Sequence, residues 1–236
     1  MNLRPNRRNL LELVEDKNRW CRPLTAEEKA KGFLGWHQRG YLPHCDFPGL
    51  VQLVTVRLAD SMPASRRHEW EHLLEIEDVR EKRTKLEDYL DRGIGACHLR
   101  NPNVAKLAVD SLLGFHGTDC QVHAWCVMPN HFHMLLKIED VPLSKIMQRW
   151  KSFVASEANA ILRRHGRFWE PEYWDTFMRD DAQEKRAVRY IENNPIKARI
   201  CRCSDAYAFS SAQFRDAHRR LQIIGNRSGA QSSSSA

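Results

Sequence analysis

The stretch Met128-Pro129-Asn130-His131-Phe132-His133-Met134-Leu135-Leu136-Lys137 decides how this sequence folds. Residues 131–137 are largely apolar and follow a Pro-Asn pair, and residues 120–127 before that pair are rich in β-branched and aromatic side chains. Pro and Asn favour tight turns over the interior of a sheet. The stretch therefore predicts two paired strands, 120–127 and 131–137, joined by a tight turn.

The segments on both sides of this hairpin have the periods of further strands and helices. We expect strands at 50–58 and 174–178, and helices at 65–90, 103–115, 144–164 and 182–193, the last ending before Pro195. The resulting β-α-β-β-α-β order predicts an α+β protein with a ferredoxin-like sandwich. Its antiparallel sheet is expected to carry helices on one face, with an added C-terminal helix.

The composition excludes several classes of protein. The chain has 236 residues, of which 42% are hydrophobic, so one domain with a sizeable core is expected. No apolar run approaches the ~18 residues of a membrane span, and the basic N-terminal segment lacks the apolar stretch of a signal peptide. We therefore expect a cytoplasmic protein without a membrane partner. The seven cysteines form no C-x-x-C pair and are expected to be reduced thiols without zinc.

The charge balance favours an anionic partner. There are 37 Lys and Arg against 30 Asp and Glu, and 37 − 30 gives a formal charge of +7. Because no basic amphipathic anchor is evident, nucleic acid is favoured over a membrane surface. Solubility alone is the other explanation of this excess.

His131 and His133 flank a single apolar residue. In a strand, the side-chain period of two places both imidazoles on the same face. Two neighbouring imidazoles can hold a divalent cation. Taken alone, the pattern favours a pair of surface histidines on an exposed strand over a metal site.

Tyr190 and Asn194 are four residues apart near the end of the last expected helix. They therefore project from the same helical face. If that face packs over the two imidazoles, the Asn194 amide oxygen can complete a set of metal ligands while Tyr190 points at whatever the metal holds. Read locally, Asn194-Pro195 is only a helix stop and Tyr190 a half-buried aromatic residue.

Together, the stretch 128–136 and the stretch Tyr190-Ile191-Glu192-Asn193-Asn194-Pro195-Ile196-Lys197-Ala198 resemble the single-tyrosine HUH transposases. Within that superfamily the chain is most similar to the REP-associated tyrosine transposases. Arg199 departs from the family pattern, in which a glycine usually follows this run, and this puts in doubt how the chain leaves the helix. Weaker similarity occurs at Arg39–His44, Tyr89–Gly93, Phe168–Glu170, Tyr173–Asp175 and Ser210–Ala212.

The resemblance implies that Tyr190 is the nucleophile and that His131, His133 and Asn194 are metal ligands. It implies Mg²⁺, while the ligand types themselves suit Mg²⁺ or Mn²⁺. The implied enzyme is a DNA transposase, a single-strand endonuclease and strand transferase. It would cleave and rejoin single-stranded, hairpin-containing DNA through a covalent 5′-phosphotyrosine.

Four basic residues near these motifs are candidates to follow the DNA backbone, and solvated surface charge is the alternative for each. They are Arg149, Lys151, Arg179 and Lys197. We expect the catalytic domain to span 46–200, after a basic N-terminal arm at 1–45. A C-terminal extension at 201–221 and a disordered Ser-rich tail at 222–236 are expected to follow.

Two other functions fit the sequence. One is a non-catalytic, sequence-specific DNA-binding regulator on the same scaffold. The other is a metal-dependent nuclease that uses activated water and needs no tyrosine. The sequence leaves open which DNA is recognised, whether the protein mobilises itself or serves its host, and whether one chain or a dimer builds the site.

Overall fold

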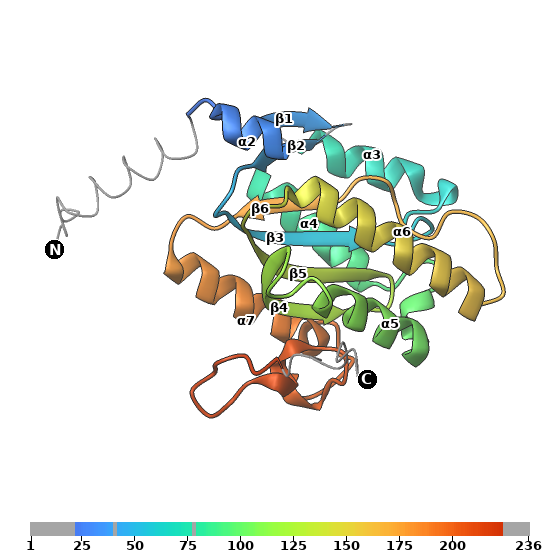
Figure 1. The fold of residues 1–236 in the computed structure, drawn as a ribbon. Coiled ribbons are helices and arrows are strands. Elements are labelled where there is room, and N and C mark those ends of the chain that lie inside the picture. The colour runs from blue at the N-terminus through green and yellow to red at the C-terminus, as the bar shows by residue number, and fades with distance from the viewer. Residues whose placement is uncertain (1–21, 40–41, 77–78, 224–236) are drawn as a thin grey trace, which may run out of the picture.

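The computed structural model describes residues 22–39, 42–76 and 79–223 (Figure 1). Its centre is an antiparallel sheet of four strands in the order β4-β5-β3-β6. The chain order of these strands and the helices between them confirms the ferredoxin-like sandwich. The strands are β3 (Val51–Arg57), β4 (Cys120–Val127), β5 (His131–Ile138) and β6 (Trp174–Phe177).

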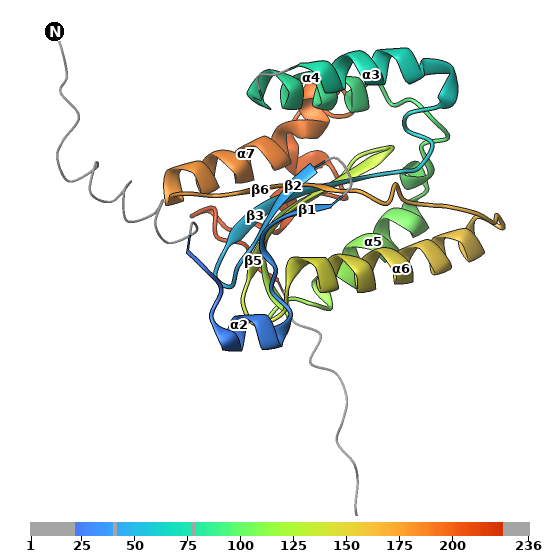
Figure 2. The same ribbon diagram turned by 90° about the horizontal axis from the view of Figure 1, so that it is seen from above.

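Helices cover both faces of this sheet. Helices α5 and α6 lie on one face, and α7 lies on the other together with α3 and α4 (Figure 2). The single helix expected at 65–90 is two helices, α3 and α4, and residues 77–78 between them lie outside the described part. The helices are α3 (Arg67–Glu75), α4 (Val79–Asp91), α5 (Pro102–Leu113), α6 (Leu143–Ile161) and α7 (Asp181–Lys197).

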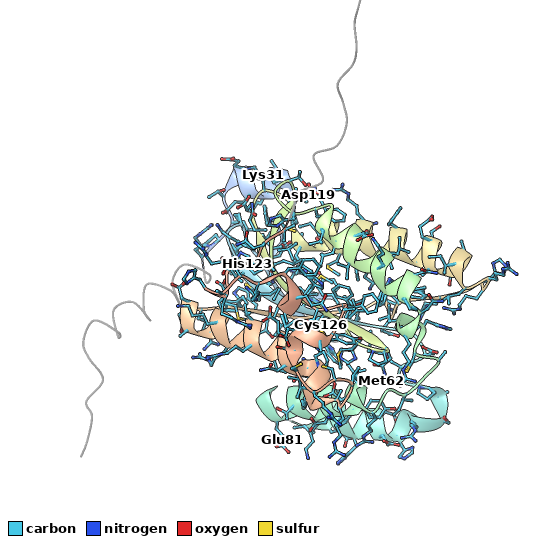
Figure 3. The ribbon with its side chains drawn as sticks, turned by 90° about the horizontal axis from the view of Figure 1, so that it is seen from below. Lys31, Met62, Glu81, Asp119, His123 and Cys126 are labelled. Atoms are coloured by element: carbon cyan, nitrogen blue, oxygen red, sulfur yellow. The ribbon has the colours of Figure 1, made fainter. Side chains whose placement is uncertain are left out.

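The two faces of the sheet differ because side chains alternate along each strand. Phe132 and Met134 of β5 point into the large apolar core under α5 and α6, where the Phe132 ring lies 5.1 Å from that of Trp150. Leu135 and Cys126 point to the opposite face and pack against α7. Cys126 lies in the interior of the molecule in Figure 3. His131 and His133 therefore share the face of α7.

The turn between β4 and β5 is as tight as its Pro-Asn pair predicts. The Met128 N–H donates to the carbonyl oxygen of His131 at 2.8 Å, which closes the hairpin. A bulge at His123, between Val122 and Ala124, shifts the register of β4. Beyond the bulge, Cys126 lies opposite His133.

Helix α7 continues past the position at which we expected it to end. It runs through Pro195 to Lys197. The proline removes one N–H donor from the last turn, but its fixed φ is compatible with the helix. Burial of Ile191 and Pro195 offsets that loss. The chain then turns at Arg199, which has a φ of 58°, the left-handed conformation usually taken by glycine at this position.

Much of the expected basic arm is folded. Residues 22–46 contain α2 (Ala26–Lys31), β1 (Gly35–Arg39) and β2 (Leu42–Asp46), and β1 and β2 form a separate two-stranded hairpin. Phe33, between α2 and β1, is buried in the main core. The basic arm expected at 1–45 is therefore wrong over residues 22–45, because the apolar contacts of these residues outweigh their basic composition. Residues 1–21 lie outside the described part.

The C-terminal extension packs along β4. The Val127 N–H donates to Phe209 O at 3.0 Å, and the Tyr207 hydroxyl donates to Val127 O at 2.6 Å. Buried Glu192 of α7 pairs with Arg215 and, at 2.8 Å, with Arg219. The extension thus joins α7 to β4. Residues 224–236 of the expected tail lie outside the described part, and within that part no helix is long and apolar enough to cross a membrane.

Candidate active site

His131 and His133 meet on the face of the sheet that α7 covers. Each is 1% exposed, and their Nε2 atoms are 3.0 Å apart. The rings stand almost perpendicular, with an interplanar angle of 82°. As expected from the period of two along β5, the two imidazoles lie on the same face, and their Nε2 atoms point towards each other.

The other nitrogen of each imidazole is held by a neighbouring polar group. Asn130 Nδ2 donates to the carbonyl oxygen of Ile94 at 3.0 Å, which turns Oδ1 towards His131. Nδ1 of His131 lies 2.8 Å from that oxygen and must carry the proton to donate to it. Its Nε2 is then left with a lone pair. On the second ring, Nδ1 of His133 lies 2.9 Å from Thr55 Oγ1.

Burial keeps His131 uncharged. Loss of hydration, reinforced by the charge of Lys197, lowers the pKa of His131 to about 3. A neutral imidazole can donate its lone pair to a metal ion, whereas an imidazolium cannot. At neutral pH, His131 is therefore in the form that metal binding requires.

Tyr190 lies against the histidine pair within the same chain. Its ring centroid is 5.6 Å from that of His133, in an edge-on arrangement. Asn194, one turn further along α7, is 1% exposed and donates from Nδ2 to Tyr190 O at 3.3 Å. Its Oδ1 is buried and receives no hydrogen bond from any described residue. The helix thus brings the phenol to the imidazoles and leaves a buried amide oxygen available as a ligand.

These residues fit a divalent cation. Two atoms bound at right angles to one ion at ~2.1 Å are about 3.0 Å apart. The two Nε2 atoms have that separation. The Thr55 hydroxyl can either donate or accept, so it suits His133 with or without a proton on Nε2. His131 and His133 would hold the ion, and Asn194 Oδ1 is an oxygen of the type that Mg²⁺ and Mn²⁺ prefer.

Sequence reasoning missed the residues that support the pair. Asn130 stands beside the first histidine, but we interpreted it only as part of the turn. Thr55 is 78 residues away from His133 in the chain, and only the pairing of β3 with β5 places them opposite each other. Metal-bound histidines usually donate their second N–H to such a group. That rule is the signal that could have identified Asn130.

A carboxylate also approaches the pair. Asp91, the last residue of α4, has Oδ1 4.0 Å from His131 Nε2 and Oδ2 3.1 Å from Lys197 Nζ. Burial raises the pKa of Asp91, and the ion pair with Lys197 only partly offsets this. The stretch Tyr89–Gly93 was part of the family resemblance, but nothing in its spacing indicated contact with the histidines.

The loop after α4 depends on glycine. Gly95 has a φ of 95°, and a Cβ there would lie 2.6 Å from Asp60 O. The neighbouring Ala96 N–H donates to Asp60 Oδ2 at 2.8 Å. This close approach holds the Ile94 carbonyl oxygen where it accepts the hydrogen bond from Asn130.

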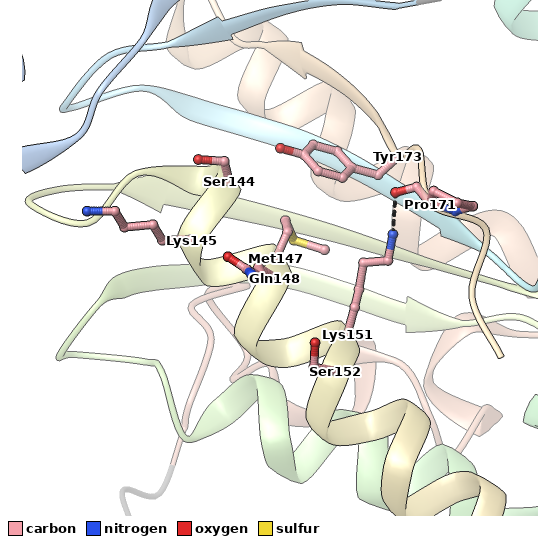
Figure 4. Close-up of a pocket in the computed structure, with 8 residues that line it drawn as sticks. All are labelled: Ser144, Lys145, Met147, Gln148, Lys151, Ser152, Pro171 and Tyr173. Atoms are coloured by element: carbon pink, nitrogen blue, oxygen red, sulfur yellow. Dashed lines mark hydrogen bonds between the residues drawn. The ribbon is translucent and has the colours of Figure 1, made fainter. Parts of the chain in front are cut away.

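Two of the four expected DNA-binding residues lie on the opposite side of the sheet from the histidines. Arg149 and Lys151 belong to α6, and Arg149 pairs with Asp119 at 2.8 Å. Lys151 donates to Glu170 O at 2.7 Å and to Pro171 O at 2.6 Å, beside a pocket of about 390 Å³ (Figure 4). Their part in DNA binding stays a prediction.

The other two flank α7. Arg179 precedes the helix, with its guanidinium 5.8 Å from the centroid of the Phe177 ring. Lys197 ends the helix and pairs with both Asp88 and Asp91, at 2.8 Å and 3.1 Å. The structure therefore does not gather the four basic residues on one surface.

Comparison with known proteins gives a family match over the site. The family model "Transposase IS200 like" matches residues 115–194, which include both histidines, Tyr190 and Asn194. A REP-associated tyrosine transposase of Escherichia coli (strain K12) is 25% identical over 77 residues, which are 33% of this chain and 45% of that protein. The match thus spans less than half the length of that relative.

A solved structure has a related shape. It is described as the REP-associated tyrosine transposase bound to a REP hairpin, with a TM-score of 0.46 and 15% identity. The similarity covers 86% of this chain and 99% of that one. The family match and the curated relative confirm the resemblance stated from the sequence: residues 115–194 are similar to IS200-like transposases, and the chain is similar to a REP-associated tyrosine transposase.

Proposed function

We propose that this protein is a DNA transposase that cleaves and rejoins single-stranded, hairpin-containing DNA through Tyr190. The observation that carries the proposal is the contact between the Tyr190 ring and His133, at 5.6 Å between centroids. A phenol beside two converging imidazoles is the arrangement that the family resemblance implies. The relative named above for its REP hairpin supports hairpin DNA as the substrate class.

In the proposed reaction, the Tyr190 hydroxyl oxygen attacks a phosphorus atom of the DNA backbone. A bond forms between that oxygen and phosphorus, and the bond from phosphorus to the 3′-oxygen breaks. The phenol loses its proton, and the departing 3′-oxygen gains one. The products are a 5′-phosphotyrosine and a free 3′-hydroxyl. Since one phosphoester replaces another, a second 3′-hydroxyl can reverse the step and join strands without ATP.

Tyrosine needs help for this attack. With an ordinary pKa of ~10, only ~0.1% of a phenol is ionised at neutral pH. A divalent cation, when bound, neutralises charge on the phosphate oxygens and makes phosphorus easier to attack. His131, His133 and Asn194 would hold it, and α7 holds the phenol beside them.

A single chain can supply every residue of the proposed site. Tyr190 and His133 meet without a partner subunit, and the extension binds α7 to β4 through Glu192 and Arg215. We therefore propose that a monomer can form the covalent intermediate. This is the cis arrangement of the two that the sequence left open.

The test is covalent capture of labelled single-stranded hairpin DNA on a denaturing gel, with Mn²⁺ present. Wild type is expected to form a protein–DNA adduct and Tyr190→Phe none. The matched control is Tyr207→Phe, which removes another phenol, hydrogen-bonded to Val127 O at 2.6 Å, and is expected to keep the adduct.

Three outcomes decide against the proposal. An adduct that persists in Tyr190→Phe excludes this tyrosine as the nucleophile. A nick without attached protein favours the nuclease that uses water. Hairpin binding with neither nick nor adduct in the wild type favours the non-catalytic regulator.

A further inference from the structure

Asp91 is a charged group at the histidine pair that the proposed function does not use. It ends α4, and its side chain is only 12% exposed. Oδ1 lies 4.0 Å from His131 Nε2 and receives no hydrogen bond from any described residue. A buried carboxylate oxygen without a donor is unfavourable, so its position needs a reason.

The atoms that Oδ1 faces cannot supply a proton. Asn130 holds the proton of His131 on Nδ1, which leaves a lone pair on Nε2. Oδ1 of Asp91 and Nε2 of His131 are therefore two acceptors directed at one place. Such a place suits a cation and the water bound to it, because that water is a strong hydrogen-bond donor.

The distance indicates how Asp91 would act. Two atoms bound side by side to one ion at ~2.1 Å are about 3.0 Å apart, which is shorter than the 4.0 Å observed here. Within the described part of the chain, no three His, Cys, Asp or Glu side chains are grouped so as to hold a metal ion. Direct binding of the ion by Asp91 is therefore not supported, whereas contact through water is.

We propose that Asp91 is a positioning residue whose Oδ1 accepts a hydrogen bond from water on the divalent cation held by His131 and His133. This inference rests on the proposed function and adds to its metal site a carboxylate that contacts the ion through water. It also gives α4, which the sequence did not connect with the site, a part in the chemistry.

The competing explanation is that Asp91 only anchors Lys197. Lys197 Nζ pairs with Asp88 at 2.8 Å and with Asp91 at 3.1 Å, so both carboxylates hold the same ammonium group. Asp88 is 49% exposed and has no contact with the histidines among the described interactions. It is therefore a matched control, with equal charge and the same partner.

The experiment is titration of Mn²⁺ into the full-length chain without DNA, followed by calorimetry. Asp91→Asn is expected to weaken Mn²⁺ binding by about tenfold or more, and Asp88→Asn by less than about twofold. Lys197→Met is expected to tighten binding, because a positive charge near the cation is removed. An anchoring role predicts that Asp91→Asn has no further effect once Lys197 is Met, whereas the proposal predicts that Asp91→Asn still weakens Mn²⁺ binding in the Lys197→Met background.

The inference is overturned if Asp91→Asn binds Mn²⁺ as wild type or as Asp88→Asn does, or if Lys197→Met weakens binding. If Asp91→Asn does not fold because Lys197 loses its partner, the double variant Asp91→Asn with Lys197→Met, compared with Lys197→Met alone, decides the matter. His131→Gln separates this failure from failure of the proposed function. If His131→Gln abolishes binding and Asp91→Asn does not, only the role of Asp91 is lost; if His131→Gln binds normally, the metal site itself is refuted.

Discussion

The protein contains two buried histidine sites that differ in their partners. His131 and His133 on β5 face each other through Nε2 at 3.0 Å, and the acidic oxygen nearest to His131 Nε2 is at 4.0 Å. His44 on β2 instead has Nδ1 bonded to Asp175 of β6 and Nε2 3.6 Å from Glu172 Oε2. Both sites are buried, so burial alone does not make a histidine a ligand.

The partners determine the charge on each ring. Burial, reinforced by the charge of Lys197, lowers the pKa of His131 to about 3, and the Asp91 carboxylate 4.0 Å away does not offset this. At His44, burial also lowers the pKa, but the hydrogen bond and charge of Asp175, with the charge of Glu172, outweigh it and the pKa is raised. The first site keeps lone pairs for a cation, whereas the second holds a proton and an ion pair that joins the hairpin to the sheet.

The largest expected effect is a separation of the two sites in activity. His131→Gln should reduce adduct formation by about 1,000-fold or more, since loss of a cation's charge stabilisation removes several kcal/mol and each ~1.4 kcal/mol is tenfold. His44→Gln should stay within about twofold. Initial rates of adduct formation on a denaturing gel measure both. Equal losses in the two variants would show that the sites are not functionally distinct.

The next effect concerns the proton on His131. Asn130→Ala should weaken Mn²⁺ binding by about tenfold to a hundredfold, because His131 loses the acceptor that fixes its tautomer. Asn159→Ala is the control, since it removes another amide bonded to a carbonyl oxygen, that of Gly166, at the same 3.0 Å. Calorimetric titration gives both affinities. An unchanged affinity in Asn130→Ala would mean that the tautomer is fixed elsewhere.

The third effect concerns stability, for which His44→Gln is expected to cost more than His131→Gln. His44→Gln should lower the free energy of unfolding by about 2 kcal/mol, because it leaves the buried Asp175 carboxylate without its charged partner. His131→Gln should cost less, since His131 is uncharged and its loss leaves no buried carboxylate without a charged partner. Urea denaturation at pH 6 measures both variants. A larger loss for His131→Gln would contradict the assignment of a structural role to His44.

The His44 contribution should also depend on pH. Its pKa in the folded protein is raised above the unfolded value near 6.5, so the stabilisation is complete below that value and is lost as pH rises through the folded pKa. The groups facing the ring are Asp175, Glu172, His37 and Tyr173. The difference in unfolding free energy between wild type and His44→Gln should therefore shrink as the pH rises through the raised pKa of His44. A difference in unfolding free energy that grows with pH would contradict this prediction.

The smallest effect concerns α7, which packs over only one of the two sites. Arg199→Gly should raise the free energy of unfolding by about 0.5–1 kcal/mol, because Arg199 has a φ of 58° and glycine adopts this conformation without strain. Arg202→Gly is the control and should bring no gain, since Arg202 is not among the residues with positive φ. Thermal unfolding compares the two. No gain in Arg199→Gly would mean that contacts of the arginine offset its strain.

Local patterns predicted much of the site. Alternation along residues 131–137 placed two imidazoles on one face, and the spacing of Tyr190 and Asn194 placed both on one helical face. These patterns depend on the geometry of a single strand or helix, which neighbouring residues determine. The capping box of Thr25 and Glu28 at the start of α2 was a similar local signal, and it could have indicated a helix within the expected basic arm.

Charge and composition predicted less. Arg149, Lys151 and Lys197 were chosen for their charge, yet the structure pairs Arg149 with Asp119 and Lys197 with Asp88, and Lys151 donates to backbone carbonyls. Composition cannot show whether a basic side chain faces an acidic partner of the same chain. That partner is fixed by how the helices pack.

The amino-acid sequence by itself determined the order of strands and helices, the pairing of His131 with His133, and the helical face shared by Tyr190 and Asn194. Tertiary structure decided that this face meets the histidines, that Thr55 and Asn130 hold their outer nitrogens, and that Asp91 reaches them from α4. The reason is that local periodicity follows from bond geometry within one element. Contacts between distant segments follow instead from strand register and from loops such as the one at Gly95, whose course depends on the packed whole.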